Sequence, residues 1–412
     1  MNNDKAAGKG LFQNAFVRTI LLSNVLLQIG IWVRNFSVLL FVMEKTGNDP
    51  YAVSLISVAE FAPIFLFSFI GGTFADRWRP KRTMVWCDVL SAVSVFAVFA
   101  TLFLGSWKAV FFATFISAIL SQFSQPSGMK LFKQHVPAEK VQQGMALLQT
   151  ITAIFMIAGP AIGSVVYQNF GIQTSIVITG IAFLLSAAVL TKLPADRKEE
   201  RAQTSEGFWR ELGAGIGYVR KSAVLSGLAG TFAAIGLASG SMQPLGVFVL
   251  TERLGLPKEN LQWFMMVNGI AMLIGGGLIA ALSKKVAPQR LLAIGMIADA
   301  IAAAAMGMST SIPLTVVAQF IMGFFLPCFM IGISTLILQN TEQSFIGRVN
   351  GVLNPFFMGM MVLAMSVSGW LKDQFSLLAI FVAAGAVFVI GLLFVIPLFK
   401  LKKPGEQKQT AA

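Results

Sequence analysis

Three charged side chains lie inside long apolar stretches of this sequence, where a charge is costly and therefore marks a candidate functional site. Arg34 follows Arg18 by 16 residues, and Glu60 precedes Asp76 by the same 16. If these stretches are consecutive antiparallel helices, a rise of ~1.5 Å per residue places both side chains roughly 24 Å from one face of a bilayer. We predict that Arg34 and Glu60 form an ion pair, since an unpaired charge at that depth would be costly.

Two interpretations of this pair stay open, a structural one and one in which it titrates and couples movement to protons. The third charge, Asp299, is the only acid within the C-terminal apolar stretches and is a further candidate for proton coupling. Its alternative role is a hydrogen bond to neighbouring backbone or hydroxyl groups. Arg34, Glu60 and Asp299 are thus the candidate proton-coupling residues.

A pair of glycines, an acid and a run of cations separate two apolar stretches at residues 71–82. The glycines allow close helix packing, the acid can cap a helix end, and cations mark a cytoplasmic loop. The segment resembles the Gly-x-x-x-Asp-Arg loop of the major facilitator superfamily, although Arg79 and Pro80 stand where that family often has Gly and Arg. The resemblance implies a cytoplasmic latch, to which we add an acid six residues past the loop; the set is Gly72, Asp76, Arg77, Lys81, Arg82 and Asp88.

Composition places the chain among membrane proteins. It has 412 residues, of which 56% are hydrophobic and only 12% charged, and its mean hydropathy is +0.75. A soluble domain carries about twice that share of charge. Both cysteines, Cys87 and Cys328, lie in apolar segments, so we expect no disulfide.

The apolar stretches predict twelve transmembrane helices, each close to the ~20 residues that a bilayer requires. They are centred near residues 31, 62, 94, 119, 155, 182, 236, 270, 299, 325, 359 and 387. With both termini in the cytoplasm, 25 of the 31 Lys and Arg residues lie inside, 5 lie outside, and Arg34 lies within a span. This asymmetry predicts a multi-pass protein of a bacterial inner membrane with both termini cytoplasmic.

The longest hydrophilic segment divides these helices six and six, which predicts an all-α polytopic fold of two pseudo-symmetric six-helix bundles. The predicted parts are a cytoplasmic N-terminus at 1–18, bundles at 19–193 and 223–399, a cytoplasmic linker at 194–222 and a cytoplasmic tail at 400–412. Within the linker, Phe208-Trp209-Arg210-Glu211 could begin an amphipathic helix along the inner surface. A glycine-rich, basic loop at 275–290 resembles a degenerate copy of the 71–82 loop.

The fifth apolar stretch contains Gly159, Pro160 and Gly163, a pattern that kinks a helix and leaves a smooth face for close packing. It resembles the antiporter motif of the same superfamily, with Ser164 in place of the last glycine and Phe155 where an upstream glycine is usual. A packing kink and a direct role in antiport both remain open.

Further segments resemble a narrower branch of the superfamily, the macrolide efflux proteins and the enterobactin exporter. They are Glu60-Phe61-Ala62-Pro63, Gly217-Tyr218-Val219-Arg220 and Gly347-Arg348-Val349. Ile31 departs from that branch, which commonly has an acid just before the residue matching Trp32, so no proton site is transferred to this position.

Polar and aromatic residues within the stretches could line a central cavity, or bond helix to helix. The candidates are Gln28, Trp32, Asn35, Gln125, Gln149, Gln243 and Asn268. Together with 36 Phe and 19 Met residues they favour a broad, mostly apolar cavity for varied ligands.

No phosphate-binding Gly-x-x-x-x-Gly-Lys-Ser/Thr motif and no Cys/His cluster occur, so we expect neither an enzyme nor a metal site. The sequence predicts a monomeric, proton-coupled exporter of lipophilic or amphipathic compounds. Its partners would be a small lipophilic substrate, protons and the lipid bilayer, without nucleic acid, and the proton gradient would take the place of a cofactor. The alternatives are a dedicated carrier of one metabolite class, such as a siderophore or lysophospholipid, and a non-transporting sensor or scaffold.

Overall fold

The structure is a computed structural model that describes residues 14–103, 107–194, 196 and 208–399, without the side chains of 68–77, 103, 208 and 209. Regular structure in these residues is helical throughout, with no strand. Contacts divide the chain into two compact units, Met1–Asn48 with Ala59–Gln203, and Asp49–Val58 with Thr204–Ala412. The predicted division at the 194–222 linker stays a prediction, because residues 195 and 197–207 lie outside the described part.

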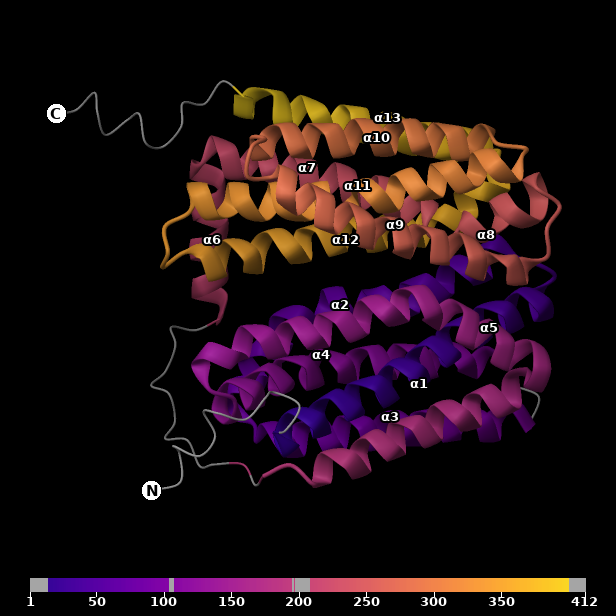
Figure 1. Ribbon diagram of the computed structural model, residues 1–412. Helices are drawn as coiled ribbons and strands as arrows, with labels where there is room; N and C mark the ends of the chain where they lie inside the picture. Colours follow the sequence, from indigo (N-terminus) through magenta and orange to yellow (C-terminus); the bar gives the residue numbers. More distant parts are fainter. Residues whose placement is uncertain (1–13, 104–106, 195, 197–207, 400–412) are drawn as a thin grey trace. The chain divides into compact units, whose positions relative to one another are not determined.

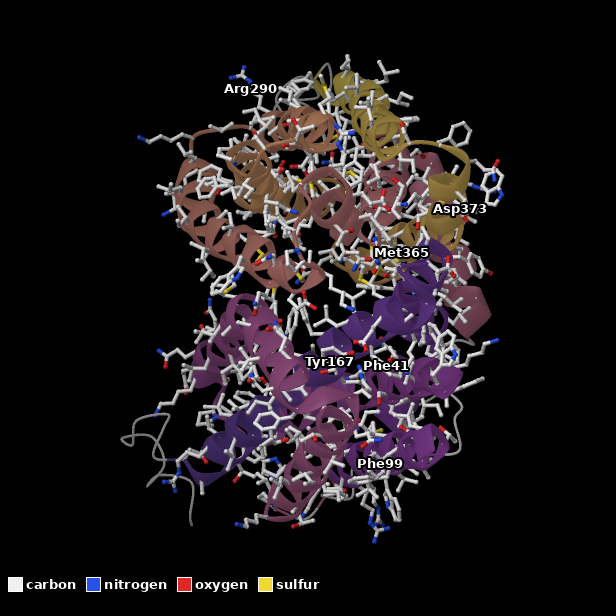
Figure 2. All side chains as sticks on the ribbon, turned by 90° about the vertical axis from the view of Figure 1, so that its right-hand side faces the viewer. Phe41, Phe99, Tyr167, Arg290, Met365 and Asp373 are labelled. Atoms are coloured by element: carbon white, nitrogen blue, oxygen red, sulfur yellow. The ribbon has the colours of Figure 1, made fainter. Side chains whose placement is uncertain are left out.

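The first unit is built from long helices that lie side by side (Figure 1). They are α1 (Ala15–Thr46), the part of α2 (Pro50–Arg77) from Ala59 onward, α3 (Pro80–Phe103), α4 (Val110–His135) and α5 (Ala138–Thr191), with the 3-10 turn η2 (Trp107–Ala109) before α4. Tyr167 of α5 donates a hydrogen bond to Glu44 of α1 at 2.8 Å, and Phe41 and Tyr167 are labelled on this pair of helices in Figure 2.

Helix α5 contains two predicted spans in one element of 54 residues. Gly171 interrupts it with φ 72° and ψ −178°, a left-handed conformation that favours glycine because it has no Cβ. The chain turns at this residue without a loop, so α5 supplies the spans centred near 155 and 182.

In the described residues, seven helices of at least 14 residues lie wholly within the second unit. They are α6 (Phe208–Lys221), α7 (Ala223–Met242), α9 (Leu261–Leu282), α10 (Pro288–Met308), α11 (Ile312–Asn340), α12 (Ile346–Gln374) and α13 (Leu377–Val395). Short elements connect or extend them: α8 (Gly246–Phe248), the π-helix η3 (Val249–Arg253), and the 3-10 turns η4 (Lys258–Asn260) and η5 (Ile396–Phe399).

Eleven helices in the described residues are long and apolar enough to cross a membrane. Because α5 is two spans joined at Gly171, they account for the twelve predicted spans, and the prediction of an all-α polytopic membrane protein is confirmed.

Small residues set the closest helix contacts of the second unit. A Cβ added at Gly275 of α9 would overlap the backbone carbonyl of Phe324 in α11, and one added at Gly323 would overlap that of Asn268. Such close backbone approach is typical of helix pairs in membranes. In the predicted degenerate loop copy, Gly275 therefore packs against α11, whereas a Cβ added at Gly276 or Gly277 would have no described atom within 4 Å.

The amphipathic helix predicted in the linker is present as α6, which lies across one end of the long helices of its unit (Figure 1). The ring of Tyr218 stacks on Phe345, just before α12, with centroids 4.5 Å apart. Its hydroxyl also accepts a hydrogen bond from the backbone N–H of Glu342 at 3.2 Å. These contacts join α6 to the segment that leads into α12.

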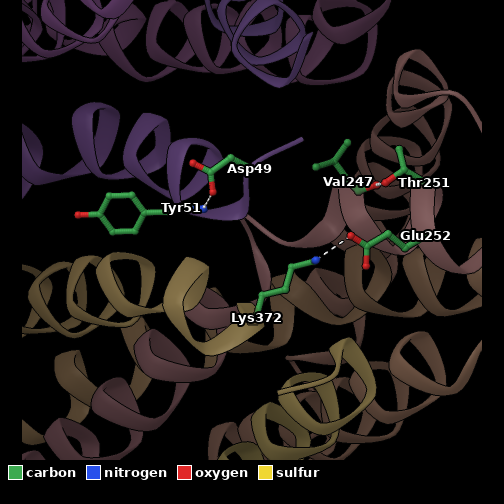
Figure 3. A network of polar contacts seen from close by, with 6 residues as sticks. All are labelled: Asp49, Tyr51, Val247, Thr251, Glu252 and Lys372. Atoms are coloured by element: carbon green, nitrogen blue, oxygen red, sulfur yellow. Dashed lines mark hydrogen bonds and ion pairs between the residues drawn. The ribbon is translucent and has the colours of Figure 1, made fainter. Parts of the chain in front are cut away.

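Polar contacts join the loops at the other end of α12 (Figure 3). Lys372 Nζ lies 2.6 Å from Glu252 Oε1 of η3 and 4.7 Å from the centroid of the Phe248 ring. The guanidinium of Arg253 donates to the carbonyls of Ser309 and Met308, each at 3.1 Å. The π-helix is thereby connected both to α12 and to the end of α10.

Candidate functional site

The two charges predicted to pair are joined through a third residue, Asn35. Its side-chain oxygen accepts hydrogen bonds from Arg34 Nε at 3.1 Å and from Arg34 Nη2 at 2.9 Å. Its amide nitrogen donates to Glu60 Oε1 at 2.7 Å. The predicted pairing of Arg34 with Glu60 is therefore made through the Asn35 amide, across which the two charges attract each other.

Arg34 is the buried member of this Arg34–Asn35–Glu60 cluster, whereas Asn35 and Glu60 are half-buried. Arg34 is only 5% exposed, and its Nη1 has no hydrogen-bond partner among the described residues. The apolar side chains of Val33 and Phe36 flank it in the sequence and are buried. A buried guanidinium with an unbonded N–H donor can change its hydrogen-bond partners when a nearby charge changes.

Helix α5 holds the cluster's helix in place through the predicted antiporter-like residues. A Cβ added at Gly159 would overlap the indole of Trp32, and one at Gly163 would lie 2.6 Å from both the Trp32 carbonyl oxygen and Phe36 Cβ. Pro160 is buried between these glycines. The motif thus brings α5 into close contact with the α1 turn that carries Arg34 and Asn35.

A second buried carboxylate, Asp88 of α3, is 3% exposed. Ser186 of α5 donates to Asp88 Oδ2 at 2.6 Å, and the Ser186 and Ser23 hydroxyls lie 2.8 Å apart. Asp88 therefore lies in a hydroxyl network that joins α3, α5 and α1. We predicted bonding within the latch, which stays untested, and Ser186 and Ser23 gave no sequence signal because serines are frequent in membrane helices.

Of the other predicted latch residues, Gly72, Asp76 and Arg77 fall in the α2 segment whose side chains lie outside the description. Lys81 Nζ donates to the carbonyl of Thr191 at 2.7 Å and to that of Leu193.

Asp196, which the sequence did not single out, also binds the start of α3. Its carboxylate accepts from the backbone N–H groups of Lys81 at 2.8 Å and Arg82 at 3.4 Å. These are the first free N–H groups of α3 after Pro80, so Asp196 caps that helix from a segment 115 residues away.

Asp299 of α10 is 6% exposed. Its Oδ1 has no hydrogen-bond partner among the described residues. One turn earlier, a Cβ at Gly295 would lie 3.0 Å from Cys328 Cβ, so α11 covers this face of α10. A buried carboxylate oxygen without a donor suits a group that takes up a proton.

The residues predicted to line a cavity fall into two groups, those that contact a neighbouring helix and those that are exposed. Gln28 donates to the Thr152 hydroxyl at 3.2 Å, and Asn268 donates to the carbonyl of Gln319 at 3.1 Å. Gln125, Gln149 and Gln243 are exposed, and Trp32 is half-buried against Gly159. The structure thus assigns helix-to-helix contacts to Gln28, Trp32, Asn35 and Asn268, of which only Asn35 belongs to the charged cluster.

Chemically, the carboxylates of these sites can take up and release protons, and their amides and hydroxyls can form hydrogen bonds. The described residues contain no group of three or more His, Cys, Asp and Glu side chains that could hold a metal. Three separate carboxylates, Glu60, Asp88 and Asp299, lie instead within membrane-spanning helices.

Comparison with known proteins places these features in a family. The family model described as Major Facilitator Superfamily matches residues 20–298 and 228–412. The uncharacterized MFS-type transporter YkuC of Bacillus subtilis is 26% identical over 412 residues, covering 96% of this chain and 95% of the relative.

Two relatives carry more specific names. The multidrug efflux pump Tap of Mycolicibacterium fortuitum is 26% identical and covers 83% of this chain and 85% of its own. The multi-drug resistance efflux pump PmrA of Streptococcus pneumoniae is 25% identical, with 83% of each chain covered.

Solved structures agree on the fold. The nucleoside transporter NupG has a TM-score of 0.77 at 14% identity and covers 94% of this chain and all (100%) of its own. A POT family transporter in complex with 5-aminolevulinic acid has a TM-score of 0.72 at 12% identity, covering 93% and 95%. Since the family model spans nearly the whole chain, this protein belongs to the Major Facilitator Superfamily and is a multi-pass membrane transporter.

Proposed function

We propose that this protein exports lipophilic or amphipathic compounds from a bacterial cell in exchange for protons. Relatives named as multidrug efflux pumps match more than four-fifths of the chain and support export. The lysines and arginines support an inner-membrane location with both termini in the cytoplasm. The protein would act as a monomer by alternating access, with the latch residues stabilising the outward-open state.

The coupling proposal rests on the Asn35 bridge, the hydrogen bonds through which Asn35 joins Arg34 to Glu60. With Glu60 ionised, this partly buried cluster has no net charge, because Arg34 and Glu60 compensate each other across the amide. A proton on Glu60 would leave the cluster with a net charge of about +1, which is costly in a medium of low dielectric. It would also weaken the charge-assisted hydrogen bond from Asn35 roughly twofold.

The protonated cluster would then rearrange. Arg34 Nη1 has no hydrogen-bond partner among the described residues, so the guanidinium has a donor ready for a new acceptor. Gly159 and Gly163 fix α1 against α5, so the change would act on the position of α2, which carries Glu60. In the second unit, Asp299 would supply a further proton site.

Transport in proteoliposomes tests this proposal. We would load vesicles with a fluorescent cationic or neutral dye, impose a pH gradient, and compare the wild type with E60Q, D299N and the double variant. The exposed acid Glu139, replaced in E139Q, is the matched control. We expect pH-driven dye movement to be lost in the double variant and abolished in the wild type by a protonophore.

Unchanged pH-driven transport in the double variant would refute the coupling assignment. If the wild type moves no dye but moves a siderophore or a lysophospholipid, the dedicated metabolite carrier replaces the exporter of varied compounds. Binding of ligands without movement of any of them would point to a sensor or scaffold.

A further inference from the structure

A pocket of about 510 Å³ opens on the side of the first unit where α3 begins. Its wall combines two arginines, Arg79 and Arg82, with aromatic and apolar side chains. Trp78 stacks on Phe123 of α4, with ring centroids 5.7 Å apart. The pocket is therefore charged near the start of α3 and apolar beyond it.

The apolar wall faces outward. Trp86 is 61% exposed and Leu90, one turn later, is 45% exposed. Val93 continues the same exposed helix face at 56%. In a membrane-spanning helix such a stripe lies against lipid, so the pocket is open to the bilayer.

The position of the two arginines matches the boundary between water and lipid. Arg79 and Arg82 precede or begin α3, and Leu90 lies eight residues past Arg82, a rise of roughly 12 Å into the membrane. Tryptophans such as Trp78 and Trp86 are typical of the interface between headgroups and hydrocarbon. The wall thus changes from cationic to aromatic to aliphatic with depth, as a phospholipid does.

The described side chains provide no acid that pairs with the arginines of this wall. Arg79 and Arg82 are exposed, and the described residues include no ion-pair partner for either guanidinium. The carboxylate of Asp196 accepts from the backbone N–H groups of Lys81 and Arg82. Two guanidinium groups that line one pocket, without an ion-pair partner among the described residues, suit a phosphate, which they bind through several N–H donors.

We propose that this pocket is a binding site for one anionic phospholipid of the cytoplasmic leaflet. The phosphate of the headgroup lies between Arg79 and Arg82, and one acyl chain runs along Trp86 and Leu90. Basic pockets between transmembrane helices on the cytoplasmic side bind such headgroups. The site is separate from the Arg34–Asn35–Glu60 cluster and does not depend on which compound is transported.

Lipid binding to the purified full-length protein tests this site. Native mass spectrometry in detergent would compare retention of phosphatidylglycerol and phosphatidylcholine by the wild type and by R79Q/R82Q. The control, K284Q/K285Q, removes two exposed lysines from the corresponding loop of the second unit. We expect the preference for phosphatidylglycerol to fall roughly 30-fold in R79Q/R82Q, about fivefold for each charge, and to persist in the control.

Two further measurements locate the lipid and identify its source. Phosphatidylglycerol with brominated acyl chains should quench tryptophan emission more strongly in the wild type than in W86F. Millimolar inorganic phosphate should leave lipid retention unchanged. The proposal is overturned if R79Q/R82Q retains the wild-type preference, if W86F is quenched as strongly as the wild type, or if phosphate alone displaces the lipid.

Discussion

Asn35 Nδ2 lies 2.7 Å from Glu60 Oε1, and this single hydrogen bond connects α1 to the one acid in the middle of α2. The same amide accepts both bonds from Arg34. An uncharged residue thus transmits the interaction between two charges, and its removal affects both of them at once.

Removing the bridge should therefore be more harmful than removing an exposed amide. In N35A, the buried Arg34 loses the single oxygen that accepts both of its hydrogen bonds, which should lower the free energy of unfolding by about 1–3 kcal/mol and abolish pH-driven transport. Thermal melting in detergent and the vesicle assay measure the two effects. The control is N169A, which removes an exposed amide bonded only to its own helix at Val165. Equal behaviour of the two variants would show that the bridge has no role.

The contact between Gly159 and Trp32 predicts a steric effect. G159A should clash with the indole and lower the free energy of unfolding by about 1–3 kcal/mol, as overpacking does. The control G213A, in α6, meets no neighbouring atom and should be neutral or slightly stabilising, since alanine favours helix. Replacing the indole as well, in G159A/W32L, should recover part of the loss. If the double variant melts no higher than G159A, the packing explanation fails.

The hydrogen bond from Ser186 to Asp88 predicts non-additive effects. S186A removes the donor and leaves a buried carboxylate, so we expect a loss of about 1–3 kcal/mol in the free energy of unfolding. D88N alone should also destabilise the protein. Because the two groups interact directly, S186A/D88N should differ from the sum of the single variants by about 0.5–3 kcal/mol. Strict additivity in a double-mutant melting cycle would contradict the network.

Asp196 as a cap of α3 gives a graded prediction. D196A removes the acceptor of two backbone N–H groups and should cost about 1 kcal/mol, as other helix caps do. D196N keeps an oxygen acceptor and should cost less. Hydrogen exchange at Lys81 and Arg82 measures the effect locally, with faster exchange expected in D196A than in D196N. Unchanged exchange in D196A would exclude the cap.

Much of the architecture could be predicted because the membrane imposes it. Apolar length located the twelve spans, and the predicted amphipathic helix beginning at Phe208 is α6. Counting residues along each helix from the membrane face predicted that Arg34 and Glu60 lie at the same depth in the bilayer. It could not reveal that Asn35 lies between them, because residues 34 and 35 point in different directions on an ideal helix and only side-chain conformation brings them together.

Contacts between distant segments were equally hidden. Nothing in the sequence connects Asp196 with the start of α3, and nothing distinguishes Ser186 from the many other serines in the spans. Gly171 was not singled out from the sequence, although it has a positive φ at the point where two spans join into one element. Each of these features depends on tertiary packing, which local patterns do not encode.

The tight fit of α5 against α1 has a consequence for genetics. A saturating mutational scan would find almost every substitution at Gly159 and Gly163 inactive, because any side chain there meets Trp32 or Phe36. Selection for packing and selection for exchange chemistry would leave the same signature at these codons. Intolerance to mutation in this motif is therefore no measure of its part in antiport, and only variants that retain normal folding and abundance can separate the two.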